Sequence, residues 1–239
     1  MKIAVILPTY NEKDNLEKLI PEIFAVFSEN KIGGQVIVVD DSSIDGTAEC
    51  VIDFQKKFPI ALIKREKKLG LGSAYIAGFK KAMELGAELI FEMDADLSHS
   101  PHELPKFMEK ISEGYDVVVG SRTVSGGKII GWGITRKIIS RAGNFVGKYI
   151  AGVYVSDLTS GYRVYKTEVL EKVDLDKVES SGYGFQLEML ARARYDVLRI
   201  GTVPITFTER SSGKSKLSKK DLITFFIIAL KIRLNLLRK

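Results

Sequence analysis

The chain has 239 residues, 45% of them hydrophobic and 28% charged, which predicts a soluble globular protein with one large core or two small ones. Cys50 is the only cysteine, which excludes an intrachain disulfide, and the first apolar run is too short for a signal peptide, so we expect a reducing, cytosolic compartment. The net charge of +6 is uneven: residues 210–239 hold nine Lys and Arg against one Asp, which leaves −2 for residues 1–209.

Short apolar segments rich in β-branched residues predict five strands buried on both faces, at residues 3–7, 36–39, 61–63, 89–93 and 117–119. Helical patterns alternate with them, from Asn11 or Asp14 to residue 28 and over residues 45–57, 71–85 and 100–112. The second half is irregular, and its glycines precede a helix expected over residues 135–150. Repeated strand-helix units predict an α/β fold, a single domain built on a mainly parallel, doubly wound sheet.

The common nucleotide-binding motifs of such sheets do not occur in this sequence. A Pro-Thr-Tyr-Asn-Glu segment at residues 8–12 follows the first strand in place of a glycine-rich loop, and the P-loop pattern is absent. Gly70 and Gly72 open a helix without the third glycine of a dinucleotide site. The sequence therefore disfavours an NTPase of the P-loop type and a dinucleotide oxidoreductase.

Polar and aromatic side chains instead follow the predicted strands where each one ends. Tyr10 and Glu12 follow the first strand, Asp40 and Asp41 end the second, and Arg122 follows the last. Aromatic, carboxylate and guanidinium side chains at neighbouring strand ends suit the binding of a nucleoside, its ribose hydroxyls and its phosphates. Taken singly, each residue also fits a turn, a cap or a surface ion pair, but their joint placement favours a ligand site.

Asp94 and Asp96 end the fourth strand, one residue apart. Alternate side chains of a strand share a face, so both carboxylates point the same way at the edge where open parallel sheets bind ligands. Two hard anionic ligands suit Mg2+ or Mn2+. The alternative to a metal site is that both aspartates only form the turn that follows the strand.

Six segments resemble, in the same order, the motifs of dolichol-phosphate mannose synthases, which are inverting family 2 glycosyltransferases with a glycosyltransferase A-type fold. They are residues 8–12 (PTYNE), 38–43 (VVDDSS), 94–99 (DADLSH), 120–122 (GSR), 157–163 (DLTSGYR) and 213–217 (GKSKL). The resemblance covers nearly the whole chain. It implies transfer of mannose from GDP-mannose to a dolichyl or polyprenyl phosphate, with a divalent cation as cofactor.

The resemblance also implies a role for each matching position. Asp96 and Arg122 are expected to be catalytic, and the nucleotide sugar is expected to contact Pro8, Tyr10, Glu12, Val39, Asp41, Asp94, Ala95, Asp96, Arg122, Arg210 and Lys216. The expected metal ligands are Asp94, Asp96 and Ser98, where Ser98 replaces a Gln found in several relatives. The expected ligands of the acceptor phosphate are Arg122, Arg136 and Ser140, the last two spaced four residues apart on one helix face.

The sequence divides into an expected catalytic domain, residues 1–217, and a basic amphipathic helix, residues 218–239. The helix contains an apolar run at residues 222–230, and nine helical residues rise only about 13 Å, less than half of a bilayer core of about 30 Å. We expect it to lie on an anionic membrane surface, to dock a small membrane subunit, or to pack in the core. The first alternative places the protein in the cytoplasm, peripheral on the cytoplasmic face of a membrane.

Two other functions remain open at this point. One is a UDP-glucose-dependent polyprenyl-phosphate glucosyltransferase, and the other is a non-catalytic module that binds nucleotides or nucleic acid. The basic tail has aromatic residues only at Phe225 and Phe226, inside the apolar run, so we expect no nucleic-acid partner. Residues 210–216 are small, polar and cationic, which predicts a lid that orders around the donor diphosphate.

Overall fold

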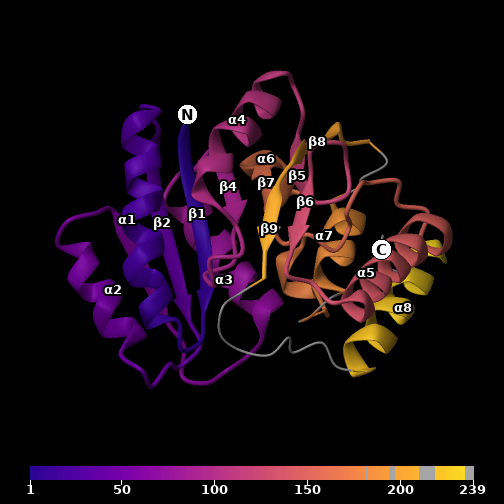
Figure 1. Cartoon of the computed structure of the whole chain (residues 1–239), viewed down its shortest axis with the longest axis horizontal. Helices are drawn as coiled ribbons and strands as arrows, with labels where there is room; N and C mark the ends of the chain where they lie inside the picture. Colours follow the sequence, from indigo (N-terminus) through magenta and orange to yellow (C-terminus); the bar gives the residue numbers. More distant parts are fainter. Residues whose placement is uncertain (181, 183, 194–196, 210–218, 235–239) are drawn as a thin grey trace.

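The computed structural model describes residues 1–180, 182, 184–193, 197–209 and 219–234. Its main sheet has the strand order β3-β2-β1-β4-β7-β5-β8 (Figure 1). The bounds are β1 Lys2–Thr9, β2 Gly33–Asp40, β3 Ile60–Lys64, β4 Leu89–Glu92, β5 Val117–Ser121, β7 Arg163–Lys166 and β8 Ile200–Pro204. Among these strands only β7 runs antiparallel to its neighbours, so the prediction of a mainly parallel sheet is confirmed.

The first half of the chain folds as the sequence predicts. The five expected strands are β1 to β5, and the expected helices are α1 Lys13–Glu29, α2 Thr47–Gln55, α3 Leu71–Glu84, α4 Leu104–Ser112 and α5 Ile134–Phe145. A short 3-10 turn, Pro101–Glu103, precedes α4, and the Ser100 hydroxyl caps it by accepting the His102 N–H at 3.3 Å. A π-helical turn, Val146–Ile150, continues α5.

The second half contains elements that the sequence pattern did not reveal. They are β7, β8, the helices α6 Thr167–Glu171 and α7 Phe185–Arg192, and a small separate sheet of β6 Lys128–Ile130 and β9 Thr206–Thr208. β7 reads Arg-Val-Tyr-Lys and lacks an apolar run. Its strand conformation depends on β4 and β5, which pair with it on both sides.

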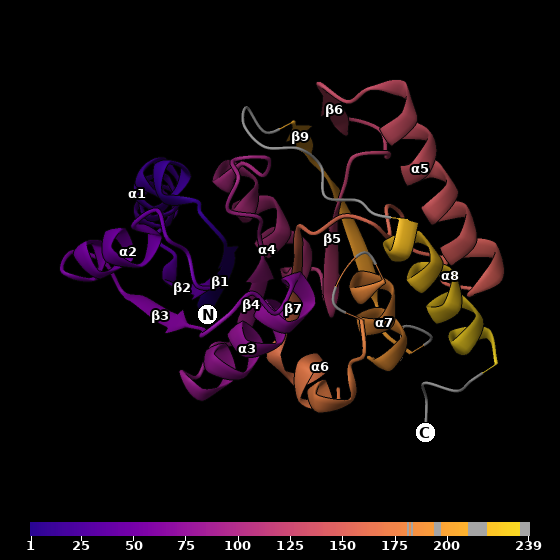
Figure 2. The ribbon, with the colours of Figure 1, turned by 90° about the horizontal axis from the view of Figure 1, so that it is seen from below.

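Helices lie against both faces of the main sheet (Figures 1 and 2), and two clusters of buried apolar residues hold them there. Alternate β1 residues divide between them, because Ile3 and Val5 join one cluster whereas Ala4 and Ile6 join the other. The first cluster receives side chains from α1, α2 and α4. The second receives side chains from α3, α6, α7 and α8, which spans Lys219–Arg233. Helices therefore cover both faces, and the strand ends remain open at one edge of the sheet.

α8 is apolar on more than one side. Its inner face packs against α7 and the π-helical turn through the buried residues Phe225, Ile228, Ala229 and Ile232. Other apolar side chains point to solvent, namely Ile223, Phe226, Ile227, Leu230 and, just after the helix, Leu234. The predicted boundary between residues 217 and 218 lies outside the described residues. Within the described ranges, each helix is too short or too polar to cross a bilayer.

α3 lies unusually close to β1 because Gly78 faces the sheet. A Cβ at this position would lie 2.4 Å from Cγ2 of Ile6, which is fully buried. We expect Gly78→Ala to lower the free energy of unfolding by about 1 to 3 kcal/mol, since overpacking outweighs the gain in helix propensity. Urea unfolding measures the change. The control is Gly133→Ala, whose Cβ meets nothing within 4 Å, and an equal effect of both variants would contradict the close approach.

Candidate active site

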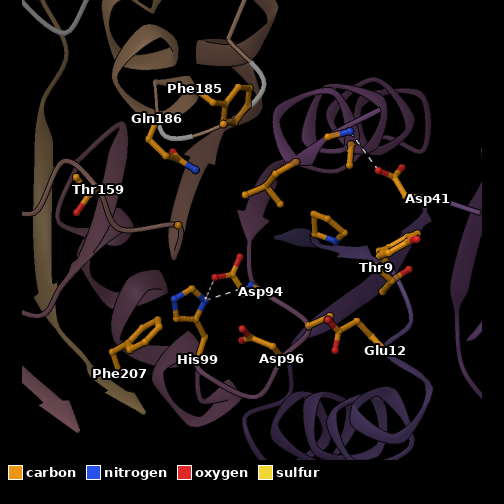
Figure 3. A pocket seen from close by; sticks show the side chains of 18 of the residues that line it. Thr9, Glu12, Asp41, Asp94, Asp96, His99, Thr159, Phe185, Gln186 and Phe207 are labelled. Atoms are coloured by element: carbon orange, nitrogen blue, oxygen red, sulfur yellow. Dashed lines mark hydrogen bonds and ion pairs between the residues drawn. The ribbon is translucent and has the colours of Figure 1, made fainter. Parts of the chain in front are cut away.

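A cavity of about 400 Å³ opens at the carboxyl ends of β1, β2, β4 and β5. Parallel strands bring their carboxyl ends to one edge of the sheet, which is why side chains from distant segments meet there. Figure 3 shows Glu12 and Asp41 on one side, Asp94 and Asp96 in the middle, and Phe207 beyond them. The cavity therefore joins the separate strand-end motifs into one site.

The Glu12 side of the cavity has an aromatic and cationic lining. Tyr10 is partly exposed, and the ammonium of Lys68 lies 3.6 Å from the centre of its ring. Asp41 is buried, pairs with Arg65, and accepts the backbone N–H groups of Leu69 and Gly70 at 3.2 and 3.3 Å. Its carboxylate therefore fixes the loop that carries Lys68.

Asp94 and Asp96 both line the cavity. β4 ends at Glu92, so the two aspartates lie in the turn after the strand, and Ala95 between them lines the cavity as well; the expected strand alternation therefore does not hold here. Asp94 accepts the Tyr75 hydroxyl at 3.3 Å, and Asp96 accepts the N–H of Ser98 at 3.1 Å across a turn in which Leu97 has φ 63°. Ser98 is buried, its hydroxyl has no hydrogen-bond partner among the described residues, and it is not part of the cavity lining. The two carboxylates supply hard oxygen ligands that fit a divalent cation completed by water and substrate oxygens.

His99 orients the Asp94 backbone. Its Nδ1 accepts the Asp94 N–H at 3.1 Å, and its ring stacks on Tyr162 at a centroid distance of 4.8 Å. Burial lowers the pKa of His99, although the neighbouring aspartates oppose this shift. The imidazole is therefore neutral at pH 7 with its proton on Nε2, which leaves no free nitrogen lone pair for a general base.

Arg122 lies in a buried ion pair at the far side of the cavity. Its Nε and backbone N–H donate to one oxygen of Asp157, at 2.7 and 2.8 Å, and its Nη2 donates to the other at 2.5 Å. Nη2 also donates to Thr159 at 2.8 Å. Burial alone would raise the pKa of Asp157, but the hydrogen bonds and charge of Arg122 outweigh it and hold the pKa below its ordinary value.

Arg136 and Ser140 lie on neighbouring cavities. Arg136 lines the same cavity as Asp94; it pairs with Glu209 at 2.9 Å and stacks on Trp132, 4.3 Å from the ring centre. Ser140 lines a second cavity, and its hydroxyl lies 3.4 Å from the Thr159 hydroxyl that Arg122 binds. Arg122 lines both cavities.

A buried polar group supports the site from beneath. Glu92 on β4 accepts the amide of Gln186 from α7, and Arg163 donates to the backbone carbonyls of Leu158, Ser160 and Gln186. Burial raises the pKa of Glu92 to about 7, in spite of the opposing charge of Arg163. These contacts connect three parts of the chain next to the cavity, namely β4, the segment that precedes β7, and α7.

The structure brings together most of the residues that the sequence singles out. Cavity-lining positions are Pro8, Tyr10, Glu12, Asp41, Asp94, Ala95, Asp96, Arg122 and Arg136. Val39 is buried in the core and Ser98 beneath the site, outside this lining. Arg210, Lys216 and the expected lid at residues 210–216 lie outside the described residues.

Sequence reasoning missed other residues that line the cavity, namely Lys68, Thr159, Phe185, Gln186 and Phe207. Two of them carried a signal: Lys68 ends the segment Arg-Glu-Lys-Lys just before the glycines at 70 and 72, and Thr159 lies in the motif at residues 157–163. Phe185 and Gln186 come from a segment without a regular pattern. Their places follow from β7 and α7, which the sequence did not predict.

The buried pair Arg122–Asp157 makes stability dependent on pH. The pKa of Asp157 is lowered by folding, so its contribution is present above the ordinary value of 3.8 and is lost as the pH falls through the folded value. We expect Asp157→Asn to lower the free energy of unfolding by about 3 to 5 kcal/mol at pH 7, because it leaves the Arg122 guanidinium buried without its carboxylate. The loss should be smaller below pH 4. Thermal unfolding against pH measures this. The control Asp176→Asn removes an exposed carboxylate that pairs with Lys80. An equal loss of stability in both variants would contradict the special contribution of the buried pair.

The fold and this edge-of-sheet site, with two aspartates in the turn after the central strand β4, define a glycosyltransferase with the A-type fold. The family model described as Glycosyl transferase family 2 matches residues 4–174, and the chain belongs to this family. It is 42% identical over 219 residues to the undecaprenyl-phosphate mannosyltransferase of Micrococcus luteus, covering 91% of this chain and 88% of that protein. It is 40% identical over 223 residues to the polyprenol monophosphomannose synthase of Mycolicibacterium smegmatis, covering 92% and 83%.

Solved structures show the same fold at low sequence identity. Glucosyl-3-phosphoglycerate synthase from Mycobacterium tuberculosis, in complex with Mn2+, UDP and glucosyl-3-phosphoglycerate, superposes with a TM-score of 0.69. The identity is 19%, and the match covers 97% of this chain and 79% of that one. A second complex of that protein, with Mn2+ and UDP-glucose, gives the same TM-score and identity over 96% of this chain and 79% of that one.

Proposed function

We propose that this glycosyltransferase transfers mannose from GDP-mannose to a polyprenyl phosphate with inversion of the anomeric carbon. The observation that carries the proposal is that Arg122 and Arg136, which lie beside the Phe207 ring, line the same cavity as Asp94 and Asp96. Cations and carboxylates in one cavity suit an anionic acceptor next to a donor diphosphate. The names of the two curated relatives support mannose and polyprenyl phosphate.

Each half of the cavity has a part in the proposed reaction. Tyr10, Glu12 and Lys68 lie where the nucleoside would bind, and Asp94 and Asp96 lie where the diphosphate would follow. The acceptor phosphate would enter beside Arg136. One of its oxygens would bond to the anomeric carbon, and the bond from that carbon to the GDP oxygen would break with its electron pair passing to GDP.

The reaction needs no general base from the chain. The second pKa of a phosphate monoester is about 6, so the acceptor is largely a dianion at neutral pH. This agrees with the neutral His99, whose Nδ1 is occupied by the Asp94 N–H. The task of Arg122 and Arg136 is to orient the dianion in line and to offset its repulsion by the donor.

Asp94 and Asp96 would hold a Mg2+ or Mn2+ ion, which supplies positive charge to the donor diphosphate and to the leaving GDP. The glucosyl-3-phosphoglycerate synthase structures hold Mn2+ together with UDP, which supports a divalent ion in this fold. Within the described part of the chain the hydroxyl of Ser98 has no hydrogen-bond partner, but Ser98 does not line the cavity. We therefore place the two aspartates, rather than Ser98, next to the ion.

Incubation with labelled GDP-mannose and a short polyprenyl phosphate tests the proposed function. We expect a labelled lipid of inverted configuration that requires Mg2+ or Mn2+ and disappears with EDTA. UDP-glucose in a parallel reaction should give far less product, and GDP should stabilise the protein against heat more than UDP. Faster transfer from UDP-glucose would favour a glucosyltransferase. Oligonucleotide binding without any sugar transfer would favour a non-catalytic module.

We further propose that the protein works peripherally on the cytoplasmic face of a membrane. α5 and α8 lie side by side at one end of the molecule (Figures 1 and 2). The exposed apolar residues of α8 have counterparts on α5 and its π-helical turn, where Ile134, Ile138, Phe145 and Tyr149 are all more than half exposed. Two adjacent apolar stripes suit shallow insertion into a bilayer surface.

Vesicle sedimentation tests this location. We expect the double variant Ile138→Ser and Phe145→Ser to lose most of its vesicle binding. Both side chains are exposed to water in the free protein, and inserting them into the bilayer would bury their apolar surface. The control is Ile44→Ser, which removes an isoleucine that is 92% exposed on another part of the surface. Unchanged binding of the double variant would leave docking to a membrane subunit as the role of this surface.

A further inference from the structure

A second cavity, of about 830 Å³, lies beside the candidate active site. α5 and the π-helical turn form one wall, and Trp132 and Tyr154 contribute aromatic surface. Its volume is within the range of small-molecule sites. The proposed transfer reaction takes place in the first cavity, and of the expected acceptor-phosphate ligands only Arg122 and Ser140 also line the second one.

The second cavity is strongly cationic. Four basic side chains and one carboxylate line it, and that carboxylate, Asp157, is already paired with Arg122. The remaining three, Lys137, Arg141 and Lys148, are exposed and form no ion pair with a carboxylate in the part of the chain that the structure describes. Their unbalanced charge favours an anionic ligand.

The three basic residues also have a definite position on the helix. Lys137, Arg141 and Lys148 repeat at intervals of four and seven residues, and so do the exposed apolar residues Ile134, Ile138 and Phe145. Lys137 and Arg141 therefore lie on a face of α5 adjacent to that of the three apolar residues, and Lys148 follows on the π-helical turn. When the apolar stripe enters the acyl layer of a bilayer, the basic stripe lies at the level of the lipid phosphates.

The buried pair Arg122–Asp157 separates the two cavities. Asp157 has no exposed side-chain surface, and its two oxygens are both bound by Arg122. A phosphate beside Lys137 and Arg141 is therefore on the far side of this pair from Asp94 and Asp96. Such a phosphate is not in a position to attack the sugar.

We propose that the second cavity binds the phosphodiester of an anionic bilayer phospholipid, as a lipid-phosphate site separate from that of the reacting acceptor. The proposal rests on the proposed membrane location, but not on the identity of the sugar donor. The bound phospholipid would fix the rotation of α5 on the bilayer and so hold the mouth of the active site against the membrane surface. Charge complementarity and the neighbouring apolar stripe favour a lipid over a free anion.

Trp132 provides a direct readout, because it is the only tryptophan of the chain and lines this cavity. The probes are dihexanoylphosphatidylglycerol below its micelle concentration, the corresponding neutral phosphatidylcholine, and inorganic phosphate, added to the whole chain without donor or acceptor. We expect a saturable change of Trp132 fluorescence with phosphatidylglycerol and none with phosphatidylcholine. Inorganic phosphate should act at least ten times more weakly, and equal potency would make this a free-phosphate site and overturn the proposal.

The test variant carries Lys137→Gln, Arg141→Gln and Lys148→Gln. The matched control carries Lys18→Gln, Lys57→Gln and Lys172→Gln, which removes the same charge from exposed lysines elsewhere. On vesicles containing about one third phosphatidylglycerol, we expect the test variant to bind about 100-fold more weakly than the control, from a contribution of about tenfold or less for each basic residue at an anionic surface. Equal binding of the two variants would overturn the proposal.

A kinetic measurement separates this site from that of the acceptor. With a short, soluble polyprenyl phosphate and no vesicles, the test variant should keep its kcat and its KM for the acceptor within about twofold. A rise of KM by tenfold or more would assign the cavity to the acceptor and overturn the proposal. If the wild-type protein binds phosphatidylglycerol but transfers no mannose, the proposed function fails and the lipid site stands. Since the three residues are exposed, a normal melting temperature is expected, and Arg141→Gln alone serves if the triple variant does not fold.

Discussion

Asp96→Asn should reduce mannose transfer by about a thousandfold, because a catalytic divalent ion stabilises the transition state by several kcal/mol and each 1.36 kcal/mol is tenfold in rate. The asparagine can still accept the Ser98 N–H, which Asp96 accepts at 3.1 Å, so the turn should survive. Asp96 is partly exposed, and we therefore expect the free energy of unfolding to change by less than about 0.5 kcal/mol. The measurements are initial rates at saturating Mg2+ and urea unfolding.

The matched control for this variant is Asp53→Asn, which makes the same change in an exposed carboxylate of α2 that pairs with Lys56. It should leave turnover within about twofold, because surface ion pairs contribute little. Near-normal turnover of Asp96→Asn would remove the metal role from the carboxylate pair. A loss of activity together with a large loss of stability would show that Asp96 acts mainly on the fold.

Arg136→Gln should raise the KM for the acceptor by about 10- to 150-fold, because a charge-assisted hydrogen bond to phosphate contributes about 1.5 to 3 kcal/mol. GDP binding should change little, since Arg136 lies across the cavity from Tyr10 and Glu12 and pairs with Glu209 at 2.9 Å. Steady-state kinetics with varied acceptor and calorimetry with GDP give the two quantities.

Lys128→Gln is the matched control for Arg136, because Lys128 is an exposed cation on nearby β6 that lines neither cavity. We expect a change in acceptor KM of less than about twofold, as for a screened surface charge. If Arg136→Gln weakened GDP binding as much as acceptor binding, Arg136 would belong to the donor half. The proposed division of the cavity would then be wrong.

The carboxylate pair and the Glu12 side of the cavity could be read from the sequence because they depend on local rules. Asp94, Asp96, Tyr10, Glu12 and Asp41 follow strands whose apolar runs are plain. Parallel strands then place all of them at one edge without further information. The expected alternation of Asp94 and Asp96 along the strand was wrong, because β4 ends at Glu92. The resemblance to known motifs added Arg136, which lines this cavity, and Ser140, which lines the next.

Long-range pairing decided the rest. β7 is a strand because β4 and β5 bond to both of its edges, and its own four residues do not predict one. That pairing positions Thr159 and, through Arg163, Gln186. Thr159 belongs to the motif at residues 157–163, but its place at the cavity, like that of Gln186, was not visible in a local pattern. Likewise the charge of Arg122 was evident in the sequence, whereas its ion pair with Asp157 was not.

The sequence by itself determined the strand-helix alternation, the mainly parallel sheet and the chemistry at the strand ends, because hydrophobic periodicity and motif spacing are local properties of the chain. Only the tertiary structure decided that α8 buries one apolar face and exposes another, and that Lys137, Arg141 and Lys148 surround a second cavity. The physical reason is that burial and charge balance depend on which segments pack together. Contacts between residues distant in sequence, such as Arg122 with Asp157, set both quantities.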